Sequence, residues 1–203
     1  MNPFPIILLL VTLSIGGGVF YHGVSGEDEN SVSRPLTYPL SRGEERERKL
    51  TFGLFVTPNP ETNPINPPER FTGYHSALDF EIFPEEESVD VPVSAACDGK
   101  ILQAEVIAGY GGVIIQSCTL ENEDVTVLYG HLDYNRFQKE VGQVIRSGEE
   151  ISFLGDEKSP ESGNTRKHLH FGIHRGAGIE VRGYVEKEAE LESFIDPAQF
   201  FKK

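Results

Sequence analysis

The chain has 203 residues, 38% of them hydrophobic, so it can bury one core and is not an intrinsically disordered chain. Its 32 acidic and 18 basic residues give a net charge of −14, which argues against nucleic acid or an anionic membrane surface as the main partner. Phosphate binding depends on clustered Lys and Arg, and this acidity instead favours solubility.

The first 26 residues predict a signal peptide or a membrane anchor. The segment from Phe4 to Phe20 is apolar and contains no charged side chain, and its length lies at the lower end of the range that spans a bilayer, about 17–25 residues. Val24–Gly26 resembles a small-residue cleavage site, but no Lys or Arg precedes Arg34. The N-terminus therefore predicts a chain addressed to a membrane, either cleaved or anchored.

Two segments of different composition follow. Residues 27–50 are polar and charged without an apolar period, which predicts a linker. Residues 51–70 contain five prolines between Pro58 and Pro68, and because proline fits neither a helix interior nor a strand ladder, we expect an extended loop there. The remaining residues, 71–203, are expected to form one domain.

This domain reads as a series of short strands separated by turn residues. The expected strands are 74–83, 91–97, 100–107, 112–118, 125–131, 144–145, 151–154 and 169–174. The only helical pattern runs from Val185 to Ser193 and stops at Asp196-Pro197. The sequence therefore predicts an antiparallel all-β fold, a sandwich or open barrel, with one short C-terminal helix.

The chain has two cysteines, Cys97 and Cys118. They are compatible with one disulfide in an oxidising compartment or with two buried thiols, and the sequence favours neither.

Four of the six histidines fall in three places within the predicted strands. His75 and Asp79 are four residues apart, which places them on one face of a strand. His131 follows Val125, Val127 and Tyr129 on one face and ends its strand. His168 and His170 alternate with Leu169, Phe171 and Ile173, which point to the other side. Clustering of so many titratable groups in a chain with few histidines indicates a functional site.

These residue types suit a hydrolytic zinc site. Zinc in such enzymes commonly takes three protein ligands from His and carboxylate and leaves one place for water. Two imidazoles and one Asp meet this need, and further imidazoles nearby could accept a proton or stabilise an oxyanion. His22 needs no role, and His174 is expected to be a solvent-exposed residue outside the site.

Three segments, in their order and separations, resemble the lysostaphin- and LytM-type zinc metallo-endopeptidases. They are GYHSALDF at 73–80, LYGHLD at 128–133 and KHLHFGIH at 167–174. The resemblance covers about residues 70–200 and includes CDGKI at 97–101, GYGGVIIQS at 109–117 and IDPAQFF at 195–201. It implies a duplicated hybrid motif fold and an enzyme that hydrolyses peptide bonds of bacterial peptidoglycan, in stem peptides or cross-bridges.

The resemblance also assigns roles. It implies one Zn²⁺ held by His75, Asp79 and His170, with His131 and His168 as catalytic residues whose division into general base and oxyanion stabiliser stays open. It further implies a domain outside the cytoplasm, secreted or anchored by the N-terminal segment alone, and we expect a monomer acting on peptidoglycan peptides.

Some family members are held latent by an upstream Asn in the fourth zinc position. Here Asn59, Asn63 and Asn66 lie in the Pro-rich stretch and could reach the site, although a plain loop role is the simpler interpretation. Arg166 and Lys167 are two cations beside the site, and we expect either solvent exposure or a contact with carboxylates of the wall peptide.

Three other functions fit parts of the pattern. A non-catalytic LytM-like domain would bind or activate another wall hydrolase, but such domains usually lose ligands that this chain keeps. A two-His-one-carboxylate Fe(II) oxygenase of the cupin type also uses His-x-His on a strand, with a different carboxylate spacing. A lipoyl or biotinyl carrier is suggested only by the glycine spacing of residues 142–155, without a convincing lysine to modify.

Overall fold

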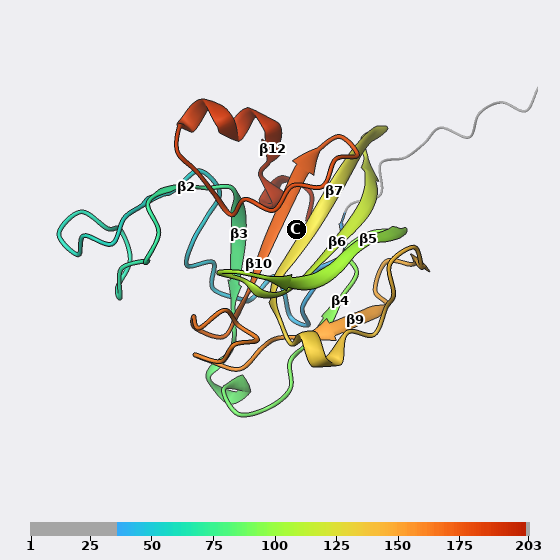
Figure 1. Ribbon diagram of the computed structural model, residues 1–203, viewed down its shortest axis with the longest axis horizontal. Coiled ribbons are helices and arrows are strands. Elements are labelled where there is room, and N and C mark those ends of the chain that lie inside the picture. The colour runs from blue at the N-terminus through green and yellow to red at the C-terminus, as the bar shows by residue number, and fades with distance from the viewer. Residues whose placement is uncertain (1–35, 202–203) are drawn as a thin grey trace, which may run out of the picture. The chain divides into compact units, whose positions relative to one another are not determined.

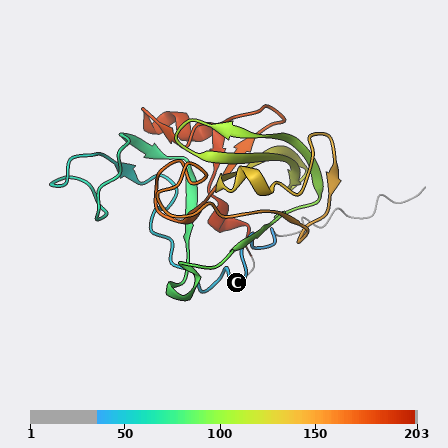
Figure 2. The same ribbon diagram turned by 60° about the horizontal axis from the view of Figure 1, so that its bottom comes forward.

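The computed structural model describes residues 36–201, and the predicted signal peptide or anchor at residues 1–26 lies outside this range. The described part of the chain is built from short strands (Figures 1 and 2). The strands are β1 Phe55–Val56, β2 Gly73–His75, β3 Ala77–Glu81, β4 Pro92–Ser94, β5 Gly99–Ile107, β6 Gly111–Leu120, β7 Glu123–Leu132, β8 Val144–Ile145, β9 Glu150–Phe153, β10 His168–Arg175, β11 Tyr184–Val185 and β12 Phe194–Ile195. The 3₁₀ helices are η1 Pro84–Glu86, η2 Tyr134–Arg136, η3 Glu188–Ser193 and η4 Pro197–Gln199.

The main sheet has the strand order β12-β10-β7-β6-β5-β8, and β3 adds to it by pairing with β10. Two smaller sheets have the orders β1-β2-β11 and β4-β9. All pairs between these strands are antiparallel. The predicted antiparallel all-β fold is therefore confirmed.

Strand β10 carries the alternation that the sequence predicts. Leu169, Phe171 and Ile173 are fully buried and belong to the main core, while His168 and His170 lie on the opposite face, in a pocket. The core beneath the sheet also includes Phe80 and Tyr129. Side chains of successive strand residues point to opposite faces, so β10 fixes the two histidines by burying their apolar neighbours.

The buried hydroxyl of Tyr129 is satisfied within this core. It donates to Oε1 of Gln116 at 2.6 Å and accepts from the backbone N–H of Ala96 at 2.8 Å. A buried polar group without partners would cost free energy. These bonds therefore let a tyrosine occupy the core beneath the sheet.

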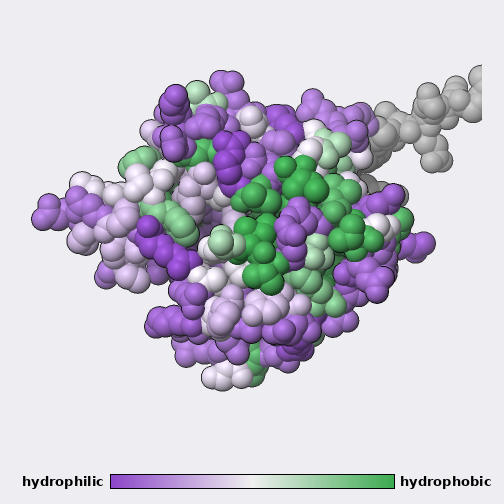
Figure 3. Space-filling view, viewed as in Figure 1, coloured by the Kyte–Doolittle hydropathy of each residue, from purple (hydrophilic) through white to green (hydrophobic). Residues whose placement is uncertain are grey.

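The other face of the central strands is also apolar. Val113, Ile115 and Leu128 are buried there, and Leu102 and Val181 are among the partly buried residues packed against them. Figure 3 shows hydrophobic side chains gathered over β5, β6 and β7. The sheet thus has apolar residues on both faces.

Residues 36–50, predicted to belong to a polar linker, pack against the domain. Leu36, Leu40 and Leu50 are buried, and Leu36 forms an isolated parallel bridge with Phe201. The side chain of Arg46 is also buried and makes two hydrogen bonds of 2.7 Å to the carboxylate of Glu86. A linker is expected because the segment has no apolar period. It packs nevertheless, because a few widely spaced leucines and one paired arginine are enough to anchor it.

The expected extended loop at 51–70 contains β1 and several turns, and its proline-rich part projects from the rest of the domain (Figure 1). Asn63 and Asn59 are bonded inside this loop. Asn63 Oδ1 accepts from the N–H of Thr57 at 3.0 Å and its Nδ2 donates to Ile65 O at 2.6 Å, while Asn59 Oδ1 accepts from the N–H of Glu61 at 3.0 Å.

The C-terminal helix predicted over Val185–Ser193 is shorter than expected. Tyr184 and Val185 pair with β2 as strand β11, and only Glu188–Ser193 are helical, as the 3₁₀ helix η3. Strand pairing takes the first residue of the predicted helix, Val185, into β11. The six residues of η3 are too few to form a stable α-helix on their own.

Cys97 and Cys118 form a disulfide that joins the segment just before β5 to the end of β6. Of the two possibilities left open by the sequence, the structure contains the cross-link. Among the helices of residues 36–201, none has the length and apolar content needed to cross a membrane.

Candidate metal centre

Three donor atoms converge where β2, β3 and β10 meet. Asp79 and His170 are direct cross-strand partners in β3 and β10, and Asp79 Oδ1 lies 3.1 Å from His170 Nδ1. His75 Nε2 lies 3.2 Å from the same carboxylate oxygen and 3.1 Å from His170 Nδ1. All three side chains are buried, and their donor atoms lie within 4.8 Å of one another.

The remaining nitrogen of each imidazole is occupied by a neighbour. His75 Nδ1 lies 3.3 Å from the carbonyl oxygen of Thr51, to which it can donate. His170 Nε2 lies 3.2 Å from the hydroxyl of Tyr110. Metal-ligating histidines characteristically use their second nitrogen in this way, which fixes the tautomer and directs the free lone pair to the metal.

The charge states of these groups suit a cation. Burial lowers the pKa of His170 to about 4, so its imidazole is neutral near neutral pH. Burial alone would raise the pKa of Asp79, but the charges of His75 and His168 and hydrogen bonds from His168 and His170 hold it well below its ordinary value. A neutral imidazole and an ionised carboxylate are the forms that bind metals. Two imidazoles and one carboxylate match the donor set of a catalytic zinc site.

The second carboxylate oxygen of Asp79 points to a different set of partners. Arg166 Nη2 donates to Oδ2 at 2.7 Å, and His168 Nε2 lies 3.2 Å from the same atom. His168 Nδ1 lies 2.9 Å from the carbonyl oxygen of Arg166, to which it can donate. Asp79 therefore joins the three-donor group to His168.

His131 reaches the site through an irregularity in β7. The register between β6 and β7 shifts at this point, since Gly112 pairs with Leu132 and Val113 with Gly130. His131 has a φ of 64°, in the left-handed region that non-glycine residues seldom adopt. Regular alternation would have turned its side chain toward the core with Tyr129, and a bulge of this kind re-aims it.

The imidazole of His131 is held beside that of His168, with ring centroids 4.4 Å apart. His131 Nδ1 lies 2.9 Å from the carbonyl oxygens of both Tyr110 and Ser162, so it donates and leaves Nε2 as the acceptor. Burial and the charges of His168 and His170 hold the pKa of His131 well below its ordinary value. The ring is therefore a neutral base near neutral pH.

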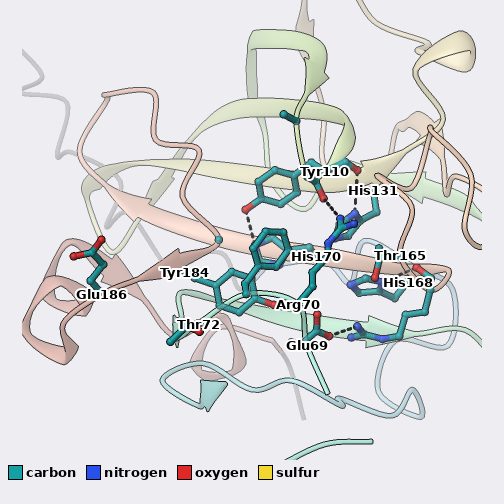
Figure 4. A pocket seen from close by; sticks show the side chains of 15 residues that line it. Glu69, Arg70, Thr72, Tyr110, His131, Thr165, His168, His170, Tyr184 and Glu186 are labelled. Carbon is teal, nitrogen blue, oxygen red and sulfur yellow. Dashed lines mark hydrogen bonds and ion pairs between the residues drawn. The ribbon is translucent and has the colours of Figure 1, made fainter. Parts of the chain in front are cut away.

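Three of the histidines, His131, His168 and His170, line a cavity of about 350 Å³. Figure 4 shows Tyr110, His131, His168, His170 and Tyr184 gathered around it. The ring of Tyr184 lies 5.3 Å from that of His75 and 5.3 Å from that of Phe71, both measured between centroids. The pocket thus has aromatic walls beside the three-donor group.

The structure brings together all five residues predicted for the site, His75, Asp79, His131, His168 and His170. His174 lies apart from them, with its ring 5.4 Å from that of Phe194. Asn59, Asn63 and Asn66 do not line the pocket in the described part of the chain.

Four neighbours of the site differ from what the sequence predicts. No role is predicted for Tyr110, which lies in the GYGGVIIQS segment, or for Tyr184. Arg166 was expected to be solvent-exposed or free for substrate, but its guanidinium contacts protein carboxylates. Lys167 is 3% exposed and donates to the carbonyl oxygen of Val89 at 2.8 Å. These contacts leave neither cation free to bind carboxylates of a peptide.

Solved structures of known proteins share this fold. The catalytic domain of the antimicrobial peptidase lysostaphin from Staphylococcus simulans aligns with a TM-score of 0.55 at 20% identity, over 82% of this chain and 100% of that one. LytU aligns with a TM-score of 0.50 at 22% identity, over 76% of this chain and 85% of that one.

A chain of the SpoIIQ–SpoIIIAH pore-forming complex aligns with a TM-score of 0.55 at 17% identity, over 85% of this chain and 94% of that one. No curated protein sequence matches the chain. The model of peptidase family M23 matches residues 73–182, which span β2 through the segment after β10 and contain all five predicted site residues. The chain belongs to peptidase family M23.

Proposed function

We propose that the protein is a zinc-dependent endopeptidase that hydrolyses peptide bonds of bacterial peptidoglycan. The observation that carries this proposal is the convergence of His75, Asp79 and His170 within 4.8 Å, beside the two further imidazoles of an accessible pocket. A site that served only to stabilise the fold would be expected to use four ligands and to be closed.

The proposed ligands are His75 Nε2, Asp79 Oδ1 and His170 Nδ1, and one Zn²⁺ fits this donor set. When bound, zinc supplies a Lewis acid that polarises a carbonyl group and makes water a nucleophile near neutral pH. The protein's own contribution is to fix these donors through the Thr51 carbonyl and the Tyr110 hydroxyl.

His131 and His168 supply the remaining chemistry. Because the Nδ1 of each faces a backbone carbonyl, Nε2 is the nitrogen that each ring can use in the reaction, and that of His168 lies 3.2 Å from Asp79 Oδ2. One of the two imidazoles accepts a proton from the attacking water, and the other donates a hydrogen bond to the tetrahedral oxyanion. The neutral state of His131 suits a base, whereas the contact of His168 with Asp79 suits a donor.

Peptidoglycan peptides are proposed as the substrate because the fold is shared with lysostaphin, an antimicrobial peptidase. The apolar N-terminal segment and the Cys97–Cys118 disulfide support a location outside the cytoplasm, secreted or membrane-anchored. We propose that the enzyme acts there as a monomer.

A second candidate is a non-catalytic module that binds another protein. It is favoured by the structural similarity to a chain of the SpoIIQ–SpoIIIAH complex. Such a module would not need the two imidazoles beside the donor group, which is why we rank it second.

Digestion of purified peptidoglycan tests the proposal. The soluble fragment should begin at residue 32 or earlier, because residues 36–50 pack against the domain. Mass analysis should detect released peptides with the untreated fragment, none after a chelator, and recovery on adding Zn²⁺. A His131→Ala/His168→Ala double variant is the matched control that keeps all three ligands. A folded, zinc-loaded fragment that releases nothing would favour the binding module.

A further inference from the structure

Arg166 lies at the centre of three carboxylates at the edge of the metal centre. Its Nη1 is 2.8 Å from Glu69 Oε1, its Nη2 is 2.7 Å from Asp79 Oδ2, and its Nε and Nη2 are 3.0 and 2.8 Å from Glu81 Oε1. The side chain of Arg166 is 20% exposed and that of Asp79 is 1% exposed. The contact between the two is therefore shielded from solvent, where charge-assisted hydrogen bonds are strongest.

The two oxygens of Asp79 have separate tasks. Oδ1 faces His75 and His170, whereas Oδ2 accepts the hydrogen bond from Arg166. A carboxylate that is free to turn could present either oxygen, or both, to a cation. The hydrogen bond from Arg166, at 2.7 Å the shorter of the two contacts of Oδ2, keeps this oxygen away from the donor group; the other contact is His168 Nε2 at 3.2 Å.

The surroundings fix the guanidinium in turn. Glu81 follows Asp79 on β3 and is the cross-strand partner of His168, and it meets Arg166 through two of its guanidinium nitrogens. The planar guanidinium offers five donors in a rigid fork, whereas a lysine offers a point charge on a flexible stem. Arginine is thus suited to contact three carboxylates at once and to hold one of them in a set orientation.

The same residue also orients His168, through its main chain. Its carbonyl oxygen lies 2.9 Å from His168 Nδ1. The carboxylates of β3 and of Glu69 hold the Arg166 side chain in place. They therefore also stabilise the position of the Arg166 carbonyl, to which the ring of His168 can donate.

We propose that Arg166 is a positioning residue of the metal centre, which holds Asp79 as a single-oxygen ligand through Oδ2. This inference rests on the proposed function in one respect, that His75, Asp79 and His170 bind Zn²⁺. It assigns Arg166 no contact with the substrate, since each of its three guanidinium nitrogens already donates to Glu69, Asp79 or Glu81.

The test compares the Zn²⁺ dissociation constants of purified full-length protein, measured by competition with a chromophoric chelator. Arg166→Met should weaken Zn²⁺ binding by about tenfold or more, the range seen when outer partners of metal ligands are removed. Arg175→Met is the matched control, because Arg175 ends β10, the strand that begins two residues after Arg166, and pairs with the exposed Glu123. It should bind Zn²⁺ within about twofold of the wild type, as expected for a surface pair.

Unchanged or tighter Zn²⁺ binding by Arg166→Met would overturn the inference. Circular dichroism of the metal-free protein reports whether each variant folds. If Arg166→Met does not fold, Arg166→Lys takes its place, and the direction of its change in Zn²⁺ affinity decides. This variant keeps the charge but not the fork, so weaker Zn²⁺ binding than in the control supports the inference and equal or tighter binding overturns it.

Kinetics separate positioning from substrate contact. The loss in Arg166→Met should appear in kcat at saturating Zn²⁺, and a rise in KM with unchanged kcat would contradict the inference. A wild type that binds Zn²⁺ but cuts no peptidoglycan defeats the proposed function alone, because the affinity comparison still stands. If the wild type binds Zn²⁺ and cuts peptidoglycan, and Arg166→Met binds Zn²⁺ with equal affinity, only the positioning role is defeated.

Discussion

His131 and His168 lie with their ring centroids 4.4 Å apart, although they come from different strands and only His168 follows regular alternation. The bulge that turns His131 out of the core places its ring 6.1 Å from that of His170, between centroids, without adding it to the three-donor group. The two imidazoles thus lie beside the three-donor group without belonging to it.

Replacing His170 should remove the metal. His170→Ala leaves two donors where catalytic zinc sites use three, so we expect metal analysis after dialysis to find little or no zinc. His174→Ala is the control, because His174 lies on the same strand but packs against Phe194. Equal zinc content in His170→Ala and the wild type would show that the ligand set is wrong.

Replacing His131 should have the opposite effect. His131→Ala leaves His75, Asp79 and His170 in place, so zinc content should remain near that of the wild type. Peptidoglycan turnover should fall by about 10²–10⁴-fold, the usual contribution of a general acid or base. If zinc content fell instead, His131 would have to be reassigned as a ligand.

Zinc should stabilise the domain against heat. A ligand that binds only the native state at about 100 times its dissociation constant contributes roughly 2.7 kcal/mol, so the Tm in a calorimetric scan should rise on adding zinc. His75→Ala should show no such rise, since it lacks one of the three donors. The same increase in both proteins would point to zinc bound elsewhere.

The buried Arg46–Glu86 pair should make stability depend on pH. Burial alone would raise the pKa of Glu86, but hydrogen bonds from Arg46 and from the backbone of Phe83 hold it below its ordinary value of 4.5. The native state therefore binds this proton less readily, and the stabilisation is present above about pH 4.5 and lost as the pH falls through the native pKa.

Urea unfolding between pH 7 and pH 3 measures this effect. The wild type should lose more stability on acidification than Glu86→Gln, which cannot titrate at this position. At pH 7, Arg46→Met should lower the free energy of unfolding by roughly 3–5 kcal/mol, because it leaves a partly buried carboxylate unpaired. The exposed Arg42→Met control should change the free energy of unfolding by no more than about 1 kcal/mol. Equal losses in the two variants would contradict the stabilising role of the Arg46–Glu86 pair.

Part of this structure can be predicted from the local pattern of the sequence. The alternation of Leu169, Phe171 and Ile173 with the histidines of β10 correctly predicts which side chains enter the core, since period two is a property of any strand. The spacing of His75 and Asp79 likewise predicts that both reach one site, which cross-strand pairing with β10 completes.

Other features depend on contacts that no local pattern contains. The left-handed conformation of His131 arises where β6 and β7 change register, a tertiary event. The packing of residues 36–50 depends on the partners of Arg46 and on leucines without regular spacing. The pairing of Tyr184 and Val185 with β2 likewise overrides the helical composition of the residues that follow.

The bridge between Leu36 and Phe201 has a consequence for how this chain is made. The backbone N–H of Leu36 donates to Phe200 O at 2.9 Å, and the ring of Tyr38 stacks on that of Phe201 at 4.5 Å. The first described residues thus pack against the last described ones. Residue 201 must therefore leave the ribosome before the domain can close, so a nascent chain that does not yet contain it stays incompletely folded and open to chaperones.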